Sequence, residues 1–253
     1  MDMGLEGKVV VITGGTAGIG KSLIPAFLAE GCKVVACGRT PQQNAAVQQE
    51  FPAAKIVAAD VSRDEDLHNL AKVAADTFGG IDIWINNAGV MLVTRLLDIT
   101  PEQWDTQMNI NVRATLRATQ IAVPYMEKRG GGVIINASSF STVIPSANTG
   151  AYAISKIALN NMTRVFAAEL APKNIRVVSY LPGMIDTPLN SGVIAANGEK
   201  LLEPIPLKRF GLSEEVAPAV VFLASSKAAY ITGTTLEVTG GKFCVQNASA
   251  VKE

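Results

Sequence analysis

Near its N-terminus the chain reads Val9-Val10-Val11-Ile12-Thr13-Gly14-Gly15-Thr16-Ala17-Gly18-Ile19-Gly20. The apolar, β-branched part is typical of a strand buried on both faces, and a helical pattern begins at Gly18. Glycines between the two permit a tight turn and a close approach of the backbone, while the helix N-terminus offers unpaired amides and a partial positive charge. The stretch therefore predicts a pyrophosphate site that contains Gly14, Thr16, Gly18, Ile19 and Gly20.

The same alternation continues along the chain. Short apolar runs recur at residues 8–13, 33–37, 55–59, 81–86, 133–137, 175–180 and 234–238. Helical patterns lie between them at residues 18–30, 64–78, 101–128, 151–170 and 213–224. This order predicts an α/β fold, in which one doubly wound Rossmann-type domain spans residues 1–253 and a parallel sheet lies between two layers of helices.

Composition argues against several classes of partner. The 22 basic residues balance 22 acidic ones without a run of either sign, so we expect no nucleic-acid surface and no anionic-membrane surface. No segment approaches the ~20 consecutive apolar residues that span a bilayer. The first residues do not form a signal-peptide pattern, so we expect a cytoplasmic protein.

Histidine and cysteine usage argues against two kinds of site. His68 is the only histidine and lies within a polar helical pattern, so neither a His-based catalytic triad nor a His-rich metal site is available. Cys32, Cys37 and Cys244 are odd in number and lack metal-ligand spacing, which favours reduced packing thiols. We expect no bound metal.

Tyr152 and Lys156 stand four residues apart in a helical pattern, so a phenol and an ammonium lie on the same face. Lowering the pKa of a tyrosine from about 10 to neutral pH needs roughly 4 kcal/mol of preferential stabilisation of the phenolate, and a neighbouring cation supplies part of it. The pair can therefore transfer a proton. In isolation this spacing more often means a buried tyrosine beside a lysine whose stem packs along apolar surface, so other motifs must support the catalytic interpretation.

The second predicted strand ends at Gly38 and Arg39. In dinucleotide folds an acidic residue usually stands here and binds the ribose hydroxyls. An acid would repel a 2′-phosphate, whereas Gly38 leaves room and Arg39 can offer a charge-assisted fork, so we expect a preference for NADP(H), with NAD(H) possible. The alternative is that Arg39 stacks on the adenine with little discrimination between the two cofactors.

Taken together, these motifs resemble those of the classical short-chain dehydrogenase/reductase family. They follow the family's order and spacing over residues 5–241 and comprise residues 13–20, Asn86-Asn87-Ala88-Gly89, Asn111, Ser139, Tyr152, Lys156 and Pro182-Gly183. The resemblance implies a seven-stranded parallel sheet of order 3-2-1-4-5-6-7. It also implies an NAD(P)-dependent oxidoreductase that acts on CH–OH or C=O groups.

The resemblance implies a role for each of four catalytic residues. Tyr152 is the general acid/base that gives a proton to a carbonyl oxygen or takes it back. Lys156 favours the phenolate and holds the nicotinamide ribose hydroxyls. Ser139 steadies the substrate oxygen, with Ser138 as the competing candidate. Asn111 distorts a helix and holds a water in a proton relay to Lys156.

Further cofactor contacts follow from the same resemblance. Asp60 and Val61 read the adenine after the third strand, and Tyr152 and Lys156 also contact the cofactor. The other contacts lie after the fourth strand or close over the nicotinamide carboxamide, and they are Asn87, Ala88, Gly89, Pro182, Gly183, Ile185 and Thr187.

Residues expected around the reacting carbon are mostly apolar, and no basic residue occurs between Ser138 and Ser155. We therefore expect a neutral, fairly hydrophobic ketone or secondary alcohol as substrate, because a carboxylate would require an Arg fork. The apolar set is Met91, Leu92, Phe140, Val143, Ile144, Met184, Leu189, Val193 and Ile194.

Two alternative functions stay open. One is reduction of a 3-oxoacyl thioester on an acyl carrier protein, an acidic partner for which Lys128, Arg129 and Lys173 offer only a thin basic patch. The other is a non-catalytic NADP-binding sensor or scaffold, although such a protein would be expected to lack Tyr152 or Lys156.

Three further expectations concern the outer parts of the domain. Around the core of residues 5–241, the weakly periodic stretch within residues 186–210 is expected to be a mobile substrate lid, and residues 242–253 form a tail. The helical patterns at 101–128 and 151–170 carry more apolar surface than one side of a sheet can cover. Family members commonly tetramerise through these helices, so we expect a homotetramer.

Overall fold

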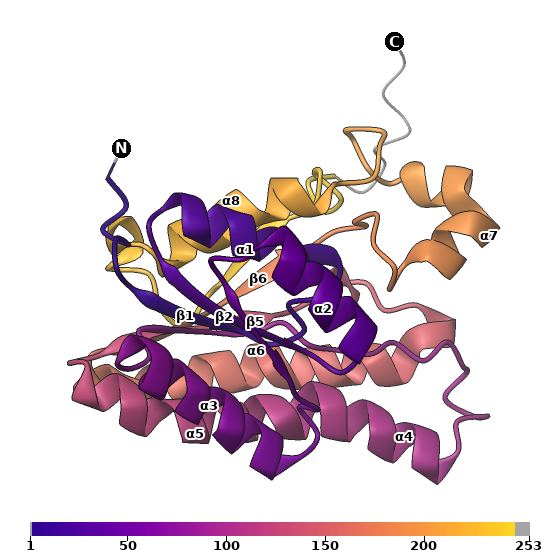
Figure 1. Ribbon diagram of the computed structural model, residues 1–253. Coiled ribbons are helices and arrows are strands. Elements are labelled where there is room, and N and C mark those ends of the chain that lie inside the picture. The colour runs from indigo at the N-terminus through magenta and orange to yellow at the C-terminus, as the bar shows by residue number, and fades with distance from the viewer. Residues whose placement is uncertain (1, 246–253) are drawn as a thin grey trace.

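Seven strands form one sheet in the computed structural model, which describes residues 2–245. Their order is β3-β2-β1-β4-β5-β6-β7, and every neighbouring pair is parallel. The strands are β1 (Val9–Ile12), β2 (Lys33–Gly38), β3 (Lys55–Ala58), β4 (Ile83–Asn86), β5 (Gly132–Ala137), β6 (Ile175–Pro182) and β7 (Thr235–Val238). The predicted fold class and strand order are both confirmed (Figure 1).

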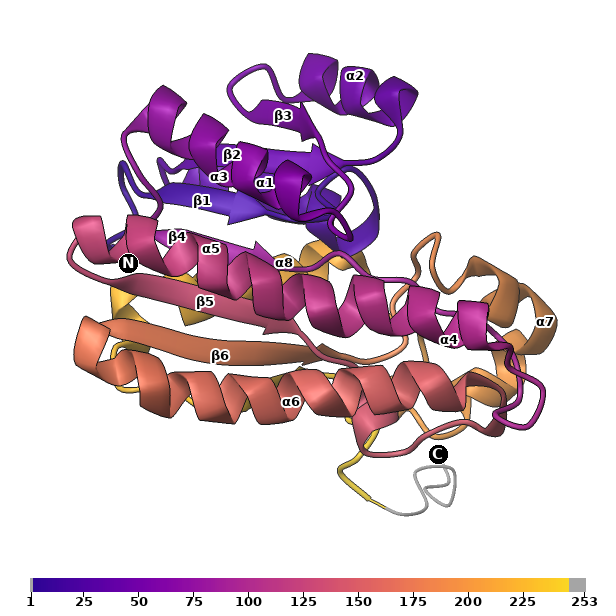
Figure 2. The same ribbon diagram turned by 90° about the horizontal axis from the view of Figure 1, so that it is seen from below.

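Helices cover both faces of this sheet (Figures 1 and 2). One layer contains α1 (Gly18–Ala29) and α8 (Ser213–Ala224), which pack against each other. The other contains α3 (Asp64–Phe78), α5 (Ala114–Lys128) and α6 (Gly150–Leu170). The remaining helices are α2 (Pro41–Glu50), near the edge strand β3, α4 (Pro101–Met108), which leads into α5, and α7 (Ser191–Leu202).

The hydrophobic core has two halves because successive side chains of a strand point to opposite faces. Along β1, Val10 and Ile12 pack toward α1 and α8, whereas Val9 and Val11 pack toward α3 and α5. All four side chains are buried, and each such burial stabilises the fold by roughly 1.5–3 kcal/mol. The continuous apolar run suits the place of β1 inside the sheet, between β2 and β4, with the turn at residues 13–17 directly at its end.

Three segments differ from the expected helices. α2 was not predicted, because Val47 is its only buried residue and its apolar periodicity is correspondingly weak. The expected helix over residues 101–128 is divided into α4, a π-helical turn (Asn109–Arg113) and α5. Part of the expected lid, which lies between β6 and α8, forms α7, a helix with no buried residue and a non-helical backbone at Asn197.

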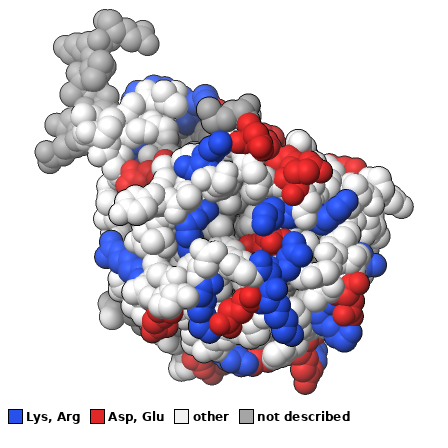
Figure 3. Space-filling model, turned by 90° about the vertical axis from the view of Figure 1, so that its left-hand side faces the viewer, with Lys and Arg blue, Asp and Glu red and all other residues white. Residues whose placement is uncertain are grey.

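The surface carries both signs of charge in close mixture. Lys and Arg side chains lie among Asp and Glu side chains over the face drawn in Figure 3, and Asp64 on α3, for example, pairs with Arg113 and Arg117. Within residues 2–245, no helix is long and apolar enough to cross a membrane. Residues 246–253 of the expected tail lie outside the described part of the chain.

Candidate active site

The glycine-rich turn joins β1 to α1 in a conformation that requires glycine. Gly14 and Gly18 have positive φ values of 64° and 49°, which favour a residue without a side chain. A Cβ atom on Gly20 would lie 2.2 Å from the Gly14 carbonyl oxygen, so a larger residue would force α1 away from the turn. No side chain caps the N-terminus of α1, and no acidic residue lies in its first turn, which leaves its first amides available to an anion.

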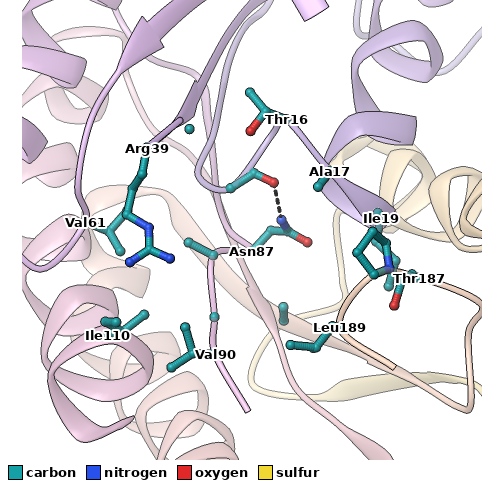
Figure 4. A pocket seen from close by; sticks show the side chains of 18 of the residues that line it. Thr16, Ala17, Ile19, Arg39, Val61, Asn87, Val90, Ile110, Thr187 and Leu189 are labelled. Carbon is teal, nitrogen blue, oxygen red and sulfur yellow. Dashed lines mark hydrogen bonds between the residues drawn. The ribbon is translucent and has the colours of Figure 1, made fainter. Parts of the chain in front are cut away.

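A cleft with a volume of about 330 Å³ opens beside this turn, at the carboxyl ends of the strands. This is the edge at which ligands bind in open α/β sheets. Figure 4 shows Arg39 and Val61 on one side of the cleft, Ile19 and Thr187 on the other, and Asn87 between them. Segments far apart in the sequence thus meet around one elongated site.

Most of the predicted cofactor residues line this cleft. They are Gly14, Thr16, Gly18, Ile19, Gly20, Arg39, Asp60, Val61, Asn87, Ala88, Gly89, Tyr152, Lys156, Pro182 and Thr187. Gly183 and Ile185 line a separate neighbouring cavity of about 110 Å³ instead. Ser138 also lines the cleft, and its buried Oγ has no hydrogen-bond partner among residues 2–245. An unpaired helix N-terminus and an unpaired buried hydroxyl are features that a dinucleotide can satisfy, so the residues present fit that group.

Arg39 places a cation at the end of the cleft near Asp60. Burial raises the pKa of the Asp60 carboxyl, but hydrogen bonds from Ser62 and the charges of Arg39 and Arg63 outweigh it, so the pKa lies below its usual value. Asp60 is therefore ionised at neutral pH and holds a fixed negative charge beside Arg39.

The environment of Gly38 differs from the expected one. A Cβ atom at this position would lie 2.2 Å from Thr16 Oγ1 and 2.6 Å from Asn44 Oδ1. The glycine was interpreted as leaving room for a phosphate, but these two side chains occupy the space around it. Gly38 is thus required by close packing inside the protein.

Asn87 connects three parts of the cleft. Its Nδ2 donates to the carbonyl oxygens of Thr13 (3.0 Å) and Gly14 (3.1 Å), which holds the turn after β1. Its Oδ1 accepts a hydrogen bond of 2.8 Å from the Tyr180 hydroxyl on β6. Tyr180 is fully buried and lines the cleft, and this contact was not predicted because 93 residues separate the two partners.

Tyr152 and Lys156 line the cleft, whereas Ser139 is not among its lining residues, and all three are buried. Burial raises the pKa of Tyr152, while the nearby Ser139 hydroxyl acts in the opposite direction. Burial lowers the pKa of Lys156 to about 8. The ammonium nitrogen lies 5.7 Å from the centroid of the Tyr152 ring and donates to the Ala137 carbonyl at 2.8 Å.

Burial raises the pKa of Tyr152 against the influence of Ser139, so the folded chain holds a neutral phenol at neutral pH. The stabilisation of the phenolate by Lys156 stays a prediction. A neutral phenol is the form that can donate a proton to a carbonyl oxygen.

Asn111 lies in the π-helical turn between α4 and α5, which agrees with the expected distortion of the helix. Its side chain accepts from the Val90 amide at 2.9 Å and donates to the Val90 carbonyl oxygen and to Ser155 Oγ, both also at 2.9 Å. Ser155 Oγ in turn donates to the Tyr152 carbonyl oxygen at 2.7 Å. Asn111 therefore links the loop after β4 to the helix that carries Tyr152.

Gln107 supports the same loop and was missed by the sequence reasoning. It is fully buried, donates to the Val90 carbonyl oxygen and accepts from the Leu92 amide at 3.0 Å. The sequence offered one indication of this role. Gln107 stands four residues before Asn111, so the two side chains lie one helical turn apart on the same face. An isolated Gln gives no indication that it is buried, so only the fold identifies it.

Lys242 is a second residue that only the fold brings to this region. Its ammonium nitrogen lies 5.0 Å from the centroid of the Phe140 ring, directly after Ser139 in the chain. Burial lowers the pKa of Lys242. The fold thus brings the Lys242 cation beside the apolar stretch around Ser139, although no basic residue stands within that stretch of the sequence.

A doubly wound parallel sheet, an uncapped glycine turn and a buried Tyr–Lys pair over one cleft define an oxidoreductase that uses a nicotinamide dinucleotide. A family model described as Enoyl-(Acyl carrier protein) reductase matches residues 14–242 of the chain. The chain belongs to the short-chain dehydrogenase/reductase family, as its motifs indicated.

Characterised relatives cover nearly the whole chain. The 3-oxoacyl-[acyl-carrier-protein] reductase FabG of Thermotoga maritima is 36% identical over 94% of this chain and 99% of its own length. The 3beta-hydroxysteroid dehydrogenase 1 of Eggerthella lenta is 37% identical over 94% of both chains. A crystal structure of 3-ketoacyl-(acyl-carrier-protein) reductase from Brucella melitensis, complexed with NADH, superposes with a TM-score of 0.90 at 34% identity and covers 94% of this chain and 99% of that one.

Proposed function

We propose that this protein interconverts a neutral, fairly hydrophobic ketone and its secondary alcohol, and that it prefers NADP(H) to NAD(H). The observation that carries the proposal is that the buried side chains of Tyr152 and Lys156 line the cleft of the dinucleotide site, with the buried Ser139 hydroxyl beside Tyr152. Tyr152 is neutral and buried, so it can donate a proton in a site from which water is largely excluded.

A bound nicotinamide would supply the hydride that the carbonyl carbon needs in reduction, and residues of the chain would transfer the proton. Tyr152 gives its proton to the carbonyl oxygen, and Ser139 donates a hydrogen bond to that oxygen while negative charge develops on it. Lys156 holds the ribose hydroxyls, and a water at the π-helical turn of Asn111 returns a proton through Lys156 to Tyr152. In oxidation each transfer runs in reverse.

An exposed apolar side chain in the cleft lining supports a hydrophobic substrate. Leu189 lines the cleft and is 44% exposed. Val143 and Ile144, in the connection that follows Ser139, are 53% and 54% exposed although they are large aliphatic residues. Exposed apolar groups that gather beside a cleft are typical of a ligand-binding surface. The proposed ketone would cover them.

Reduction of a 3-oxoacyl thioester is the second candidate, and the names of the Thermotoga and Brucella relatives favour it. The suggested basic patch supports it poorly. Arg129 donates to Asp82 and Lys173 pairs with Glu127, so two of its three cations are already engaged. The patch also precedes β5 and β6, whereas the cleft lies at the opposite, carboxyl ends of these strands.

One assay separates these substrates. Consumption of NADPH and of NADH is followed separately with neutral ketones, keto acids and 3-oxoacyl thioesters. We expect the highest kcat/KM with NADPH and a bulky neutral ketone, and no turnover by Tyr152→Phe, whose fold is checked by circular dichroism and whose cofactor binding is checked by fluorescence. Preferred turnover of keto acids would contradict the proposal of a neutral substrate. If Lys242→Met loses this turnover, the Lys242 ammonium binds the carboxylate of the keto acid. Preferred turnover of thioesters would favour the second candidate.

The cofactor preference rests on Arg39. Its side chain lines the cleft beside Asp60, where a 2′-phosphate would give it a stronger partner. We expect Arg39→Ala to weaken NADPH binding by roughly 10- to 100-fold, the value of one charge-assisted contact, and to change NADH binding little. The control is Lys33→Ala, which also removes one positive charge, at the exposed start of β2. Equal dissociation constants of the wild-type protein for NADPH and NADH would contradict the preference.

We further propose a homotetramer, in which α6 contributes to a subunit interface. Ile154, Ile157 and Val165 on this helix are 42%, 42% and 54% exposed, so an apolar stripe faces outward. Burial of such a stripe against another subunit would stabilise the assembly. Light scattering is expected to give four times the mass of the chain, and a lower mass for Val165→Glu. A monomeric wild-type protein would contradict the proposal.

A further inference from the structure

Ser139 has a second serine bonded to it. Ser139 begins a short 3-10 turn (Phe140–Thr142), and its Oγ accepts from the backbone amide of Ser141 at 3.2 Å. The same Oγ also accepts from the Ser141 hydroxyl at 3.0 Å. Both serines are 4% exposed, so water does not compete freely for these bonds.

These two bonds use the whole acceptor capacity of Ser139. A hydroxyl has one donor hydrogen and two acceptor lone pairs. With the amide and the hydroxyl of Ser141 on the lone pairs, the hydrogen of Ser139 must point elsewhere. The hydrogen of Ser139 can be donated to the Tyr152 hydroxyl, because the Ser139 side chain lies close enough to lower the pKa of Tyr152.

We infer that Ser141 is a positioning residue that keeps the single hydroxyl hydrogen of Ser139 directed toward Tyr152, and toward the reacting oxygen once a substrate takes its place there. The inference rests on the proposed function of Ser139. It adds a role for Ser141, which does not line the cleft. Ser141 does not touch the substrate. It acts through the direction that it imposes on the Ser139 hydrogen.

A purely structural role would need only one of the two bonds. The amide of Ser141 already satisfies the start of the turn, and Thr142 Oγ1 donates to the Ser139 carbonyl oxygen at 2.9 Å. The hydroxyl of Ser141 is therefore additional to the capping of this turn. In Ser141→Ala the turn keeps both backbone contacts, but Ser139 regains a free lone pair and can rotate its hydrogen away from Tyr152.

Rotation of the Ser139 hydroxyl should change the pKa of Tyr152, which also depends on the titratable groups around it. Lys156 lies on the same helix and Tyr180 faces Tyr152 from β6. Neither contacts Ser141, so the substitution leaves both in place. Loss of donation from Ser139 should raise the pKa of Tyr152 further above its usual value, because a hydrogen bond to the phenolate favours the ionised form.

The kinetic test compares Ser141→Ala and Ser141→Thr with Ser146→Ala, a matched change at an exposed serine of the same connection. We expect kcat to fall about 10-fold in Ser141→Ala with KM within about twofold, which is less than the loss caused by removal of a direct donor. Ser141→Thr keeps the hydroxyl and should restore kcat. In a Ser139→Ala background, Ser141→Ala should cause no further loss, because the residue through which it acts is gone.

A titration decides the inference without any substrate. Proteins with 13C-labelled tyrosine are titrated by NMR from about pH 8 to about pH 11, and Tyr152→Phe assigns the signal. We expect the Tyr152 signal to move to higher pH in Ser141→Ala and to stay unchanged in Ser146→Ala. An equal titration midpoint of Tyr152 in the wild type and in Ser141→Ala would overturn the inference, as would equal kcat values in folded proteins. Absence of turnover by the wild type with every substrate would instead contradict the proposed function, and the titration would still test Ser141.

Discussion

Lys156 shows how burial can set the charge of a single residue near the physiological range. Its ammonium is 3% exposed and donates to one carbonyl oxygen, so the charged form loses most of its hydration. This lowers the pKa from 10.5 to about 8. About half of the molecules therefore carry the cation at pH 8, nearly all carry it well below this pH, and few carry it well above.

The affinity for cofactor should follow this titration. If the ammonium holds the ribose hydroxyls, NADPH binding is expected to weaken roughly 10-fold or more between about pH 7 and about pH 9.5, as the charged fraction falls. Fluorescence titration of NADPH at several pH values measures this. Lys156→Arg keeps its charge throughout the range, so its weaker binding should be independent of pH. A constant wild-type affinity would contradict the role assigned to Lys156.

Gly38 gives a second prediction for a single residue. Gly38→Asp would introduce the acid that NAD-binding folds carry, but its Cβ would collide with Thr16 Oγ1 and Asn44 Oδ1. We expect weaker binding of both cofactors and not a change of preference. Gly38→Asp combined with Thr16→Gly removes one collision and should recover NADH binding, which calorimetry would detect. Tight NADH binding by Gly38→Asp alone would show that the neighbouring side chains move away easily.

The segment from α4 to α5 acts as one element that supports the loop after β4. Gln107 at the end of α4 and Asn111 in the π-helical turn together hold the amide and carbonyl groups of Val90 and the amide of Leu92. Gln107 and Asn111 are four residues apart, so both side-chain amides lie on the helix side that faces this loop.

Removal of Gln107 should therefore loosen the loop and destabilise the fold. Gln107→Leu keeps much of the volume but leaves the Leu92 amide without its partner, at a cost of about 1–3 kcal/mol. Urea unfolding measures the loss, and hydrogen exchange should show faster exchange at Leu92. The control is Gln49→Leu on the exposed face of α2. Equal stability of the two variants would mean that water replaces the Gln107 contacts without loss.

The sequence was most informative where an element carries its own pattern. Continuous apolar runs identified all seven strands, and apolar periodicity identified α1, α3, α6 and α8. It could not identify α2, which buries only Val47, because its stability comes from contacts with β2 and β3 that local periodicity does not record. The π-helical turn was expected only through the family resemblance of Asn111, since no local rule distinguishes it from an α-helix.

At the scale of the whole molecule, the site also combines residues that local motifs predict with residues that only the fold brings together. Tyr152 with Lys156 and the glycine turn are local motifs, so their spacing could be read directly. Tyr180, Gln107 and Lys242 reach the site from distant segments, and their positions depend on strand order and register. A buried polar contact across many residues leaves no pattern in a single sequence.

Alkaline pH should destabilise the whole domain through its buried thiols. Burial raises the pKa of Cys37 to about 12, whereas the unfolded thiol titrates near 9. Its contribution to stability is therefore complete below pH 9 and is lost progressively as the pH rises toward 12, with a limit on the order of 4 kcal/mol. Lys156 has the opposite effect between pH 8 and 10.5, because its folded pKa is lowered.

A comparison of variants isolates the thiol. Between about pH 9 and about pH 10.5, the free energy of unfolding should fall less in Cys37→Ala than in the wild type, by about 2 kcal/mol at the upper end. Urea unfolding under reducing conditions measures both. Cys244→Ala, at an exposed position, should follow the wild type. Parallel curves for Cys37→Ala and the wild type would show that other groups control alkaline unfolding.

The hydrogen bond from Tyr180 to Asn87 also has a consequence for biosynthesis. As the chain leaves the ribosome, the turn after β1 emerges early, but the phenol that orients Asn87 follows 93 residues after that amide. A nascent chain that has not reached β6 therefore has an incomplete binding site. NADP(H) should bind only chains whose sheet has closed around Tyr180, and by mass action it would stabilise these over unfinished ones. The cellular supply of cofactor would then influence how much newly made protein survives quality control.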